Sequence, residues 1–174
     1  YHDGTRPREV YWASDEAQVK LKPGADPAAV LAGAELLQAR AADLRLRKAF
    51  ADRSAFTTWA SALQRREEVV RVLPVFYATA RGLANRLEQE RMTLTRRVAL
   101  TTPPGIPGEQ LAARYGARVL EKVTYLPDTY ILEASGSFEA LDLAVALRER
   151  DLVPVAIPQF AMRARKLSGR RSAA

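Results

Sequence analysis

Residues 151–160 read DLVPVAIPQF, and residues 67–76 read EEVVRVLPVF. Both are short apolar runs in which a proline stands two residues before a phenylalanine. Extended upstream without a gap to 62–76 and 146–160, the two segments match at alanine, leucine, arginine, valine, proline and phenylalanine positions. Helix-to-strand junctions rarely coincide this closely by chance, so the chain is predicted to contain an internal repeat.

The beginnings of the two repeats also correspond. Residues 18–30, QVKLKPGADPAAV, resemble residues 97–111, RVALTTPPGIPGEQL, because each alternates as a strand, stops at a Pro-Gly turn and restarts as a helix. Two copies of one unit are therefore expected. The predicted organisation is an N-terminal arm (1–17), a first unit (18–78), a connecting helix (79–95), a second unit (96–162) and a basic C-terminal tail (163–174).

The second unit predicts the element order βαββαβ. Its expected elements are a strand at 98–100, a helix at 108–115, strands at 117–123 and 129–133, a helix from Ser137 and a closing strand at 153–160. This order favours an α+β fold of the ferredoxin-like type, with two helices over one face of an antiparallel sheet in each unit. Proline has no N–H to donate, so Pro154 and Pro158 place the closing strand at a sheet edge.

The first unit is less regular and is shorter than the second. Asp26 and Pro27 are expected to open a helix that continues to Leu37, and residues 43–50 alternate as a strand. Because little chain remains before a helix around Trp59, the central hairpin of this unit is expected to be abbreviated.

Composition limits the function. Hydrophobic residues make up 48% and charged residues 27% of the chain, which is typical of a folded soluble protein. No apolar stretch approaches the roughly 18 residues that span a membrane. There is no cysteine and the single histidine is His2, so thiol chemistry and a Ser-His-Asp triad are not expected. We expect no enzymatic activity, cofactor or metal, and both a secreted and a cytoplasmic location fit.

The net charge is +7, and arginines alternate with glutamates along the helical stretches. This pattern favours solvated faces of mixed charge. RNA-recognition domains share the βαββαβ order, but they place stacking aromatics in a K/R-G-F/Y-type motif that residues 98–100 and 129–133 lack. RNA binding is therefore a lesser alternative.

The second unit resembles the propeptide, or inhibitor, domain of subtilisin-like serine proteases. The resemblance rests on the Pro-Gly turn after the first strand, the segment PDTYILE at 127–133 and the closing pattern A-L-(x5)-V-(x4)-P-x-F at 146–160. It covers residues 97–162, and residues 18–77 resemble a shorter tandem duplicate of the same domain.

The resemblance implies a protein partner, a subtilisin-like serine protease bound in cis or in trans. The chain would be a cleaved prodomain or a freestanding inhibitor, and it could also assist the folding of its target. The exposed sheet face would dock on the protease, and the C-terminal extension would enter the substrate cleft as an added strand. The residues placed in that cleft are Ala161, Met162, Arg163, Ala164, Arg165, Lys166, Leu167 and Ser168. The alternative is a ferredoxin-like scaffold for general protein association, in which Phe76 and Phe160 serve only packing.

Overall fold

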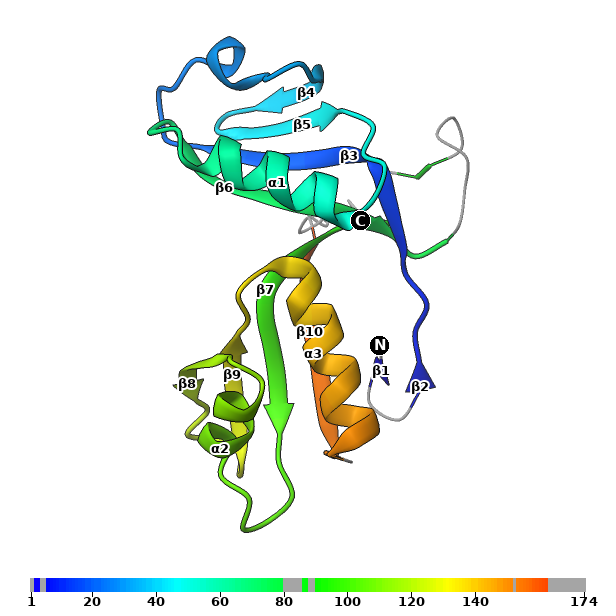
Figure 1. The fold of residues 1–174 in the computed structure, drawn as a ribbon, viewed down its shortest axis with the longest axis vertical. Coiled ribbons are helices and arrows are strands. Elements are labelled where there is room, and N and C mark those ends of the chain that lie inside the picture. The colour runs from blue at the N-terminus through cyan, green and yellow to red at the C-terminus, as the bar shows by residue number, and fades with distance from the viewer. Residues whose placement is uncertain (1, 4–5, 80–85, 88–89, 152, 163–174) are drawn as a thin grey trace, which may run out of the picture.

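The structure is a computed structural model that describes residues 2–3, 6–79, 86–87, 90–151 and 153–162 (Figure 1). The strands in this part of the chain are β1 (His2–Asp3), β2 (Arg6–Pro7), β3 (Tyr11–Leu21), β4 (Glu35–Arg40), β5 (Asp43–Arg47), β6 (Val69–Tyr77), β7 (Arg91–Thr101), β8 (Arg118–Lys122), β9 (Thr129–Glu133) and β10 (Val155–Met162). The α-helices are α1 (Arg53–Gln64), α2 (Gly108–Arg114) and α3 (Ser137–Arg150), and η1 (Pro27–Val30) is a 3-10 turn. The mixed α+β class predicted from the sequence is confirmed.

One eight-stranded antiparallel sheet runs through the molecule. Its order is β4-β5-β3-β6-β7-β9-β8, and β10 pairs with the other edge of β7. Within residues 11–77 the strands lie in the order second, third, first, fourth, and within residues 91–162 they lie in the same order. The two repeats therefore share one strand arrangement, and they join where Val75–Tyr77 of β6 pairs with Arg91–Thr93 of β7.

The first unit differs from the sequence prediction in its first helix. The expected helix through Leu37 is wrong: the chain makes only the turn η1, and Leu36 and Leu37 belong to β4. Asp26 caps the turn by accepting a hydrogen bond from Ala28 N (2.9 Å), and Ala32 and Gly33 then take positive φ angles of 47° and 75°. These left-handed residues end the helix.

The first unit is therefore shorter because its first helix is reduced to the turn η1. Its central hairpin, which was expected to be abbreviated, is complete, with β4 and β5 pairing from Glu35–Arg47 to Arg40–Asp43. This unit also has one α-helix over its sheet in place of the two that were predicted.

Two predicted connecting segments contain strand. Tyr11–Ala17, assigned to the N-terminal arm, form the first part of β3, and Arg91–Thr95, assigned to the connecting helix, begin β7. Met92 and Leu94 pack in the hydrophobic core, and residues 91–94 pair with β6 and β10, so the segment is a strand and not a helix. Residues 80–85 and 88–89 of the predicted connecting helix lie outside the described residues.

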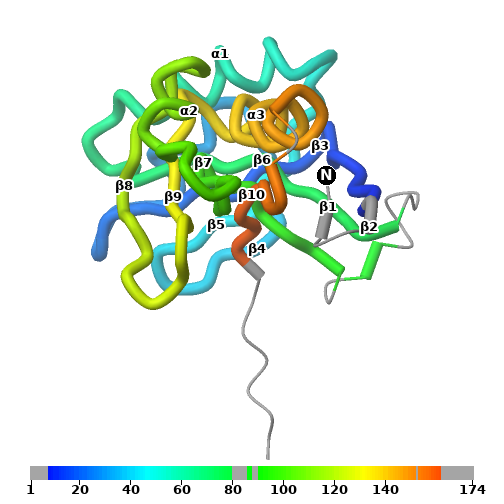
Figure 2. The backbone as a smooth tube through the Cα atoms, turned by 90° about the horizontal axis from the view of Figure 1, so that it is seen from below, coloured from blue at the N-terminus to red at the C-terminus, as the bar shows by residue number. Residues whose placement is uncertain are grey.

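The three α-helices lie on one side of the sheet (Figure 2). Helix α1 packs on β6, α2 on β8 and β9, and α3 on β7 and β10. The opposite side, which we call the open face, has no helix over it in the described part of the chain (Figure 2).

The two units share an aromatic core where they meet. Phe138 of α3 belongs to the second unit, and the centre of its ring lies 5.1 Å from the ring centre of Trp12 and 5.6 Å from that of Phe56, both in the first unit. Phe76 and Phe160, the phenylalanines of the repeated motif, are in edge-to-face contact at 5.7 Å. Phe76 is buried and Phe160 is partly buried, so both serve packing, and the two copies of the motif are in contact.

The repeated prolines stand where strand pairing is interrupted. Pro74 pairs with Ala17 and Phe76 with Trp12, so extra residues of β3 bulge out between these pairs. Pro158 likewise pairs with Val98 and Phe160 with Leu94. In the described sheet β10 pairs only with β7, which confirms the predicted edge position. A missing N–H is tolerated at such places.

Candidate functional site: the open face and the closing strand

The open face of the second unit contains an uncharged patch beside charged side chains. Strand residues alternate between the two faces, and those paired across strands share a face. Val98, Leu100, Leu132 and Ala156 are buried under the helices. The alternate residues therefore form the open face, and we call its uncharged set the apolar face: Ala99, Thr101, Thr129, Ile131, Val155 and Ile157. All six are half-buried. The same pairings place Arg97, Arg118, Glu121 and Glu133 around this set on the open face.

The open face of the first unit is charged. By the same alternation it presents Lys20, Asp43, Arg45, Arg47 and Arg71. Arg47 pairs with Glu35 of β4 at 3.2 Å. The two units therefore offer chemically different surfaces on one continuous sheet.

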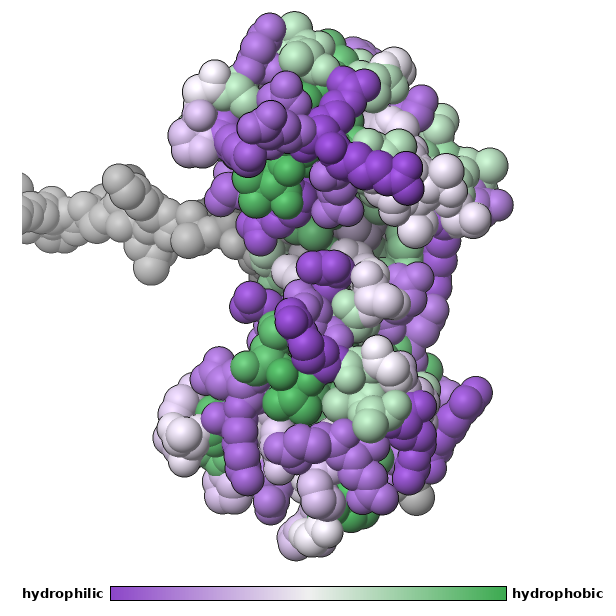
Figure 3. All heavy atoms as spheres, turned by 60° about the vertical axis from the view of Figure 1, so that its left-hand side comes forward, coloured by the Kyte–Doolittle hydropathy of each residue, from purple (hydrophilic) through white to green (hydrophobic). Residues whose placement is uncertain are grey.

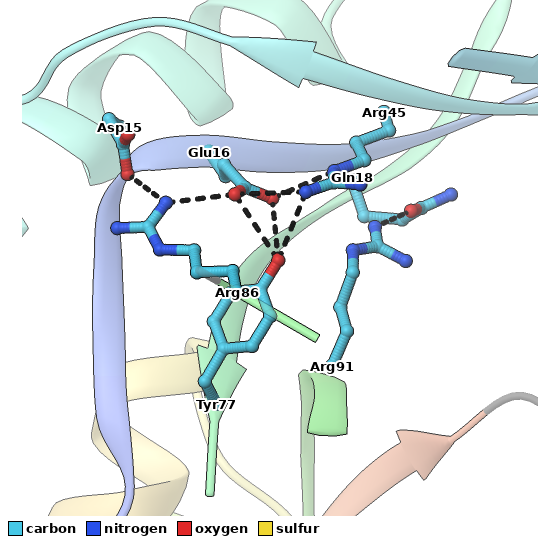
Figure 4. A network of polar contacts seen from close by, with 7 residues as sticks. All are labelled: Asp15, Glu16, Gln18, Arg45, Tyr77, Arg86 and Arg91. Atoms are coloured by element: carbon cyan, nitrogen blue, oxygen red, sulfur yellow. Dashed lines mark hydrogen bonds and ion pairs between the residues drawn. The ribbon is translucent and has the colours of Figure 1, made fainter. Parts of the chain in front are cut away.

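A buried carboxylate, Glu16 of β3, lies among arginine side chains on the first unit's part of the sheet (Figure 4). Glu16 is 0% exposed and receives hydrogen bonds from Arg45 Nε (2.9 Å), Arg86 (2.8 Å) and the Tyr77 hydroxyl (3.1 Å). Arg86 also binds Asp15 at 2.6 Å, and its guanidinium lies 5.3 Å from the centre of the Tyr77 ring.

The surroundings of Glu16 favour its charged form. Burial alone raises the pKa of its carboxyl group, but the hydrogen bonds and charges of Arg45 and Arg86 outweigh burial and hold the pKa below its usual value. Burial and the neighbouring Glu16 charge raise the pKa of Tyr77 to about 12. At neutral pH the Glu16 carboxylate is therefore ionised and the Tyr77 phenol is protonated. The bonds of Arg86 to Glu16 and Asp15 hold its side chain against this part of the open face.

This cluster was not predicted from the sequence because Glu16 was assigned to the N-terminal arm. The available signal was the alternation of polar Glu16, Gln18 and Lys20 with apolar Ala17, Val19 and Leu21. That pattern extends the strand upstream of Gln18.

The predicted protease-binding tail begins inside the sheet. Ala161 and Met162 are the last residues of β10, and they pair with Thr93 and Met92. Thr93 Oγ1 donates to the Ala161 carbonyl at 3.2 Å. The other predicted tail residues, Arg163, Ala164, Arg165, Lys166, Leu167 and Ser168, lie outside the described residues.

A cleft of about 900 Å³ lies between the units, where β6 separates from β7. Its walls include Gln64 of α1 and Leu73 of β6 on one side and Ser137 of α3 on the other. Arg97 and Glu133 also line it, so its charges are of both signs and select no ligand class. In the view of Figure 3 the molecule narrows to a waist between the units.

The described residues contain no group of three or more His, Cys, Asp or Glu side chains placed to hold a metal ion. Within the same residues, no helix is long and apolar enough to span a bilayer.

No protein-family model, no curated protein and no solved structure matches this chain. The interpretation of the site therefore rests on its own geometry and chemistry.

Proposed function

We propose that this chain inhibits a subtilisin-like serine protease, either as a prodomain or as a separate inhibitor, and that it acts by binding and not by catalysis. The strand order second, third, first, fourth, together with the βαββαβ sequence of the second unit, is the arrangement of a ferredoxin-like split βαβ unit. This arrangement supports the proposal because it is the strand order expected of the propeptide domains that the sequence resembles.

The apolar face carries the proposal. Its six uncharged side chains lie on three adjacent strands and have no helix over them in the described chain. Contiguous apolar surface of this kind is typical of protein-binding sites. The charged open face of the first unit lacks this property, which favours the second unit as the one that docks.

The closing strand supplies the second part of the mechanism. β10 lies at the sheet edge and leads directly into the predicted tail. We propose that residues 163–168 leave this edge and pair with the protease cleft by β-augmentation. The same docking surface could stabilise late folding intermediates of a large protease with many non-local contacts, which is the chaperone role.

The alternatives have less support. A βαββαβ module that binds RNA on its open face needs exposed aromatic side chains there. Tyr77 is 2% exposed, and the apolar face contains no aromatic residue. A general interaction scaffold remains the second candidate, because the apolar face would serve any protein partner.

The test measures inhibition of a panel of subtilisin-like proteases by residues 1–174 and by residues 1–162. The full chain is expected to inhibit at least one enzyme, and loss of residues 163–174 is expected to weaken inhibition at least tenfold. If the full chain neither binds nor inhibits any enzyme of the panel, the proposed function is wrong. Unchanged inhibition by the shortened chain would instead refute only insertion of the tail.

Two matched variants test the docking surface. Ile157→Glu places a charge on the apolar face, and Arg71→Glu reverses a charge on the first unit's open face. Ile157 is partly exposed and Arg71 is exposed, and a glutamate at 71 would face Lys20 across the strands, so the fold should tolerate each change. We expect Ile157→Glu to abolish measurable inhibition and Arg71→Glu to leave it within about threefold of the unaltered chain; the opposite pattern would assign docking to the first unit.

A further inference from the structure

An exposed apolar tip lies at the end of the second unit. We define the tip as Ile106, in the loop between β7 and α2, with Tyr125 and Leu126 in the turn between β8 and β9. Their exposed fractions are 38%, 82% and 48%. In the described chain Tyr125 makes no hydrogen bond or ring contact. The side chain of Tyr125 therefore contributes little to the stability of the fold.

The two loops of the tip are tied to each other. Thr102 N donates to the Asp128 carbonyl at 2.9 Å, and Leu126 N donates to the Val123 carbonyl at 3.3 Å. The loops also contain Pro103, Pro104, Pro107 and Pro127, whose φ angles are fixed. The tip is thus held in one conformation before any partner arrives, which lowers the entropy lost on binding.

The tip continues the apolar face. Thr129 Oγ1 donates to the Pro127 carbonyl at 3.0 Å, and the same hydroxyl lies 3.1 Å from Thr101 Oγ1. Thr101 and Thr129 belong to the apolar face and are the last and first residues of their strands. A partner that covers these strands to their ends would meet Tyr125 and Leu126 next.

The charges near the tip favour a protein pocket over a lipid surface. Lys122 is engaged with the Tyr130 ring at 5.5 Å, and Asp128 adds a negative charge beside it. Binding to an anionic membrane requires an excess of basic residues around the apolar side chains. The tip has no such excess.

We infer that Tyr125 and Leu126 form an anchor that fills an apolar pocket on the same protease that the apolar face binds. This inference rests on the proposed function and adds to it a second contact, at the opposite end of β10 from the predicted tail. An aromatic residue on a rigid turn is the type of side chain that dominates binding energy at interfaces.

The experiment compares Tyr125→Ala, Leu126→Ala and Tyr125→Phe in the complete chain. The probe is the protease that the unaltered chain inhibits most tightly in the panel described above. Leu36→Ala, an equally surface-exposed leucine on β4 of the first unit, is the matched control. The inhibition constant and the dissociation rate are measured, and thermal unfolding checks that each variant folds.

Tyr125→Ala and Leu126→Ala are each expected to raise the inhibition constant about tenfold or more, mainly through faster dissociation. The inhibition constants of Tyr125→Phe and Leu36→Ala should stay within twofold of that of the unaltered chain. The first variant keeps the aromatic ring, and the second leaves the tip unchanged. Unchanged inhibition in Tyr125→Ala would overturn the anchor while leaving the proposed function in place.

Two further outcomes also decide the question. If the unaltered chain inhibits no protease, the proposed function fails first and the anchor fails with it. If instead Tyr125→Ala loses binding to phosphatidylglycerol vesicles while its inhibition is unchanged, the tip belongs to a lipid surface and the anchor is refuted.

Discussion

The contact between Phe76 and Phe160 should couple the stabilities of the two units. Their ring centroids lie 5.7 Å apart at an interplanar angle of 77°, within the range in which edge-to-face pairs contribute about 0.5–1.5 kcal/mol beyond area burial. Phe76 is 2% exposed and also contacts Phe138 at 6.2 Å. Phe76→Leu keeps most of the buried volume, so it is expected to lower the free energy of unfolding by about 2 kcal/mol.

A double-mutant cycle isolates the ring pair. Phe76→Leu, Phe160→Leu and the double variant are unfolded in urea, and the coupling energy is expected to be about 1 kcal/mol. The two tryptophans, Trp12 and Trp59, both lie in the first unit, and Trp12 also contacts Phe138 of the second unit. Their fluorescence therefore follows the first unit and its contact with α3, whereas far-UV circular dichroism follows the whole chain. Because the units share a core, both probes should give one coincident transition.

Independent units would give a different result. Separate midpoints for fluorescence and circular dichroism, with a coupling energy below about 0.3 kcal/mol, would show that the rings touch without joining the units energetically. Tyr125→Phe, at an exposed position in the turn between β8 and β9 and outside the strands of the ring pair, serves as the matched control and should leave the coupling unchanged.

Three other perturbations test single features of the fold. Glu16→Gln is expected to cost about 2 kcal/mol in urea unfolding, because two arginines lose a buried charged partner but keep some contact with water. Folding lowers the pKa of Glu16, so the stability that its carboxylate contributes is present above the unfolded pKa of about 4.3 and is lost as pH falls through the folded pKa. The free energy of unfolding of Glu16→Gln should therefore fall less between pH 5 and pH 2 than that of the unaltered chain. Equal dependence of the two unfolding free energies on pH would contradict this. Gly108→Ala should destabilise by about 1–3 kcal/mol, since a Cβ there would lie 2.4 Å from the Tyr130 ring, and a thermal melt without a lower midpoint would refute the close contact. Ala32→Gly should raise the free energy of unfolding by about 1 kcal/mol, because the residue has a φ of 47°, and a destabilised variant would argue against that conformation.

Most elements of the second unit could be predicted because their signals are local. Ser137 begins α3, the alternating residues 129–133 form β9, and the glycine at 116 follows α2. The first unit was harder to read because Val30, Leu31, Ala34 and Leu37 fit helical spacing by coincidence. Only Val30 of these is fully buried, and the left-handed conformations at Ala32 and Gly33 break the helix.

The candidate site was only partly visible in the sequence. The closing strand and its edge position follow from Pro154 and Pro158, whose missing N–H is a property of the residue itself. The apolar face could not be assigned, because a strand pattern shows that two faces differ without showing which one the helices cover. Glu16 was missed because its partner Arg86 is distant in sequence.

By itself the sequence determined that the chain has a mixed α+β fold, indicated two similar segments, and placed its closing strand at a sheet edge. These features depend on turn chemistry, alternation and the absence of an amide proton in proline, all of which act within a few residues. Only the tertiary structure decided that the units fuse into one sheet through β6 and β7, that Phe76 meets Phe160, and that an apolar face stays open beside a charged one. Those outcomes depend on non-local strand pairing and on which side of the sheet three helices occupy, and neither is encoded in any single segment.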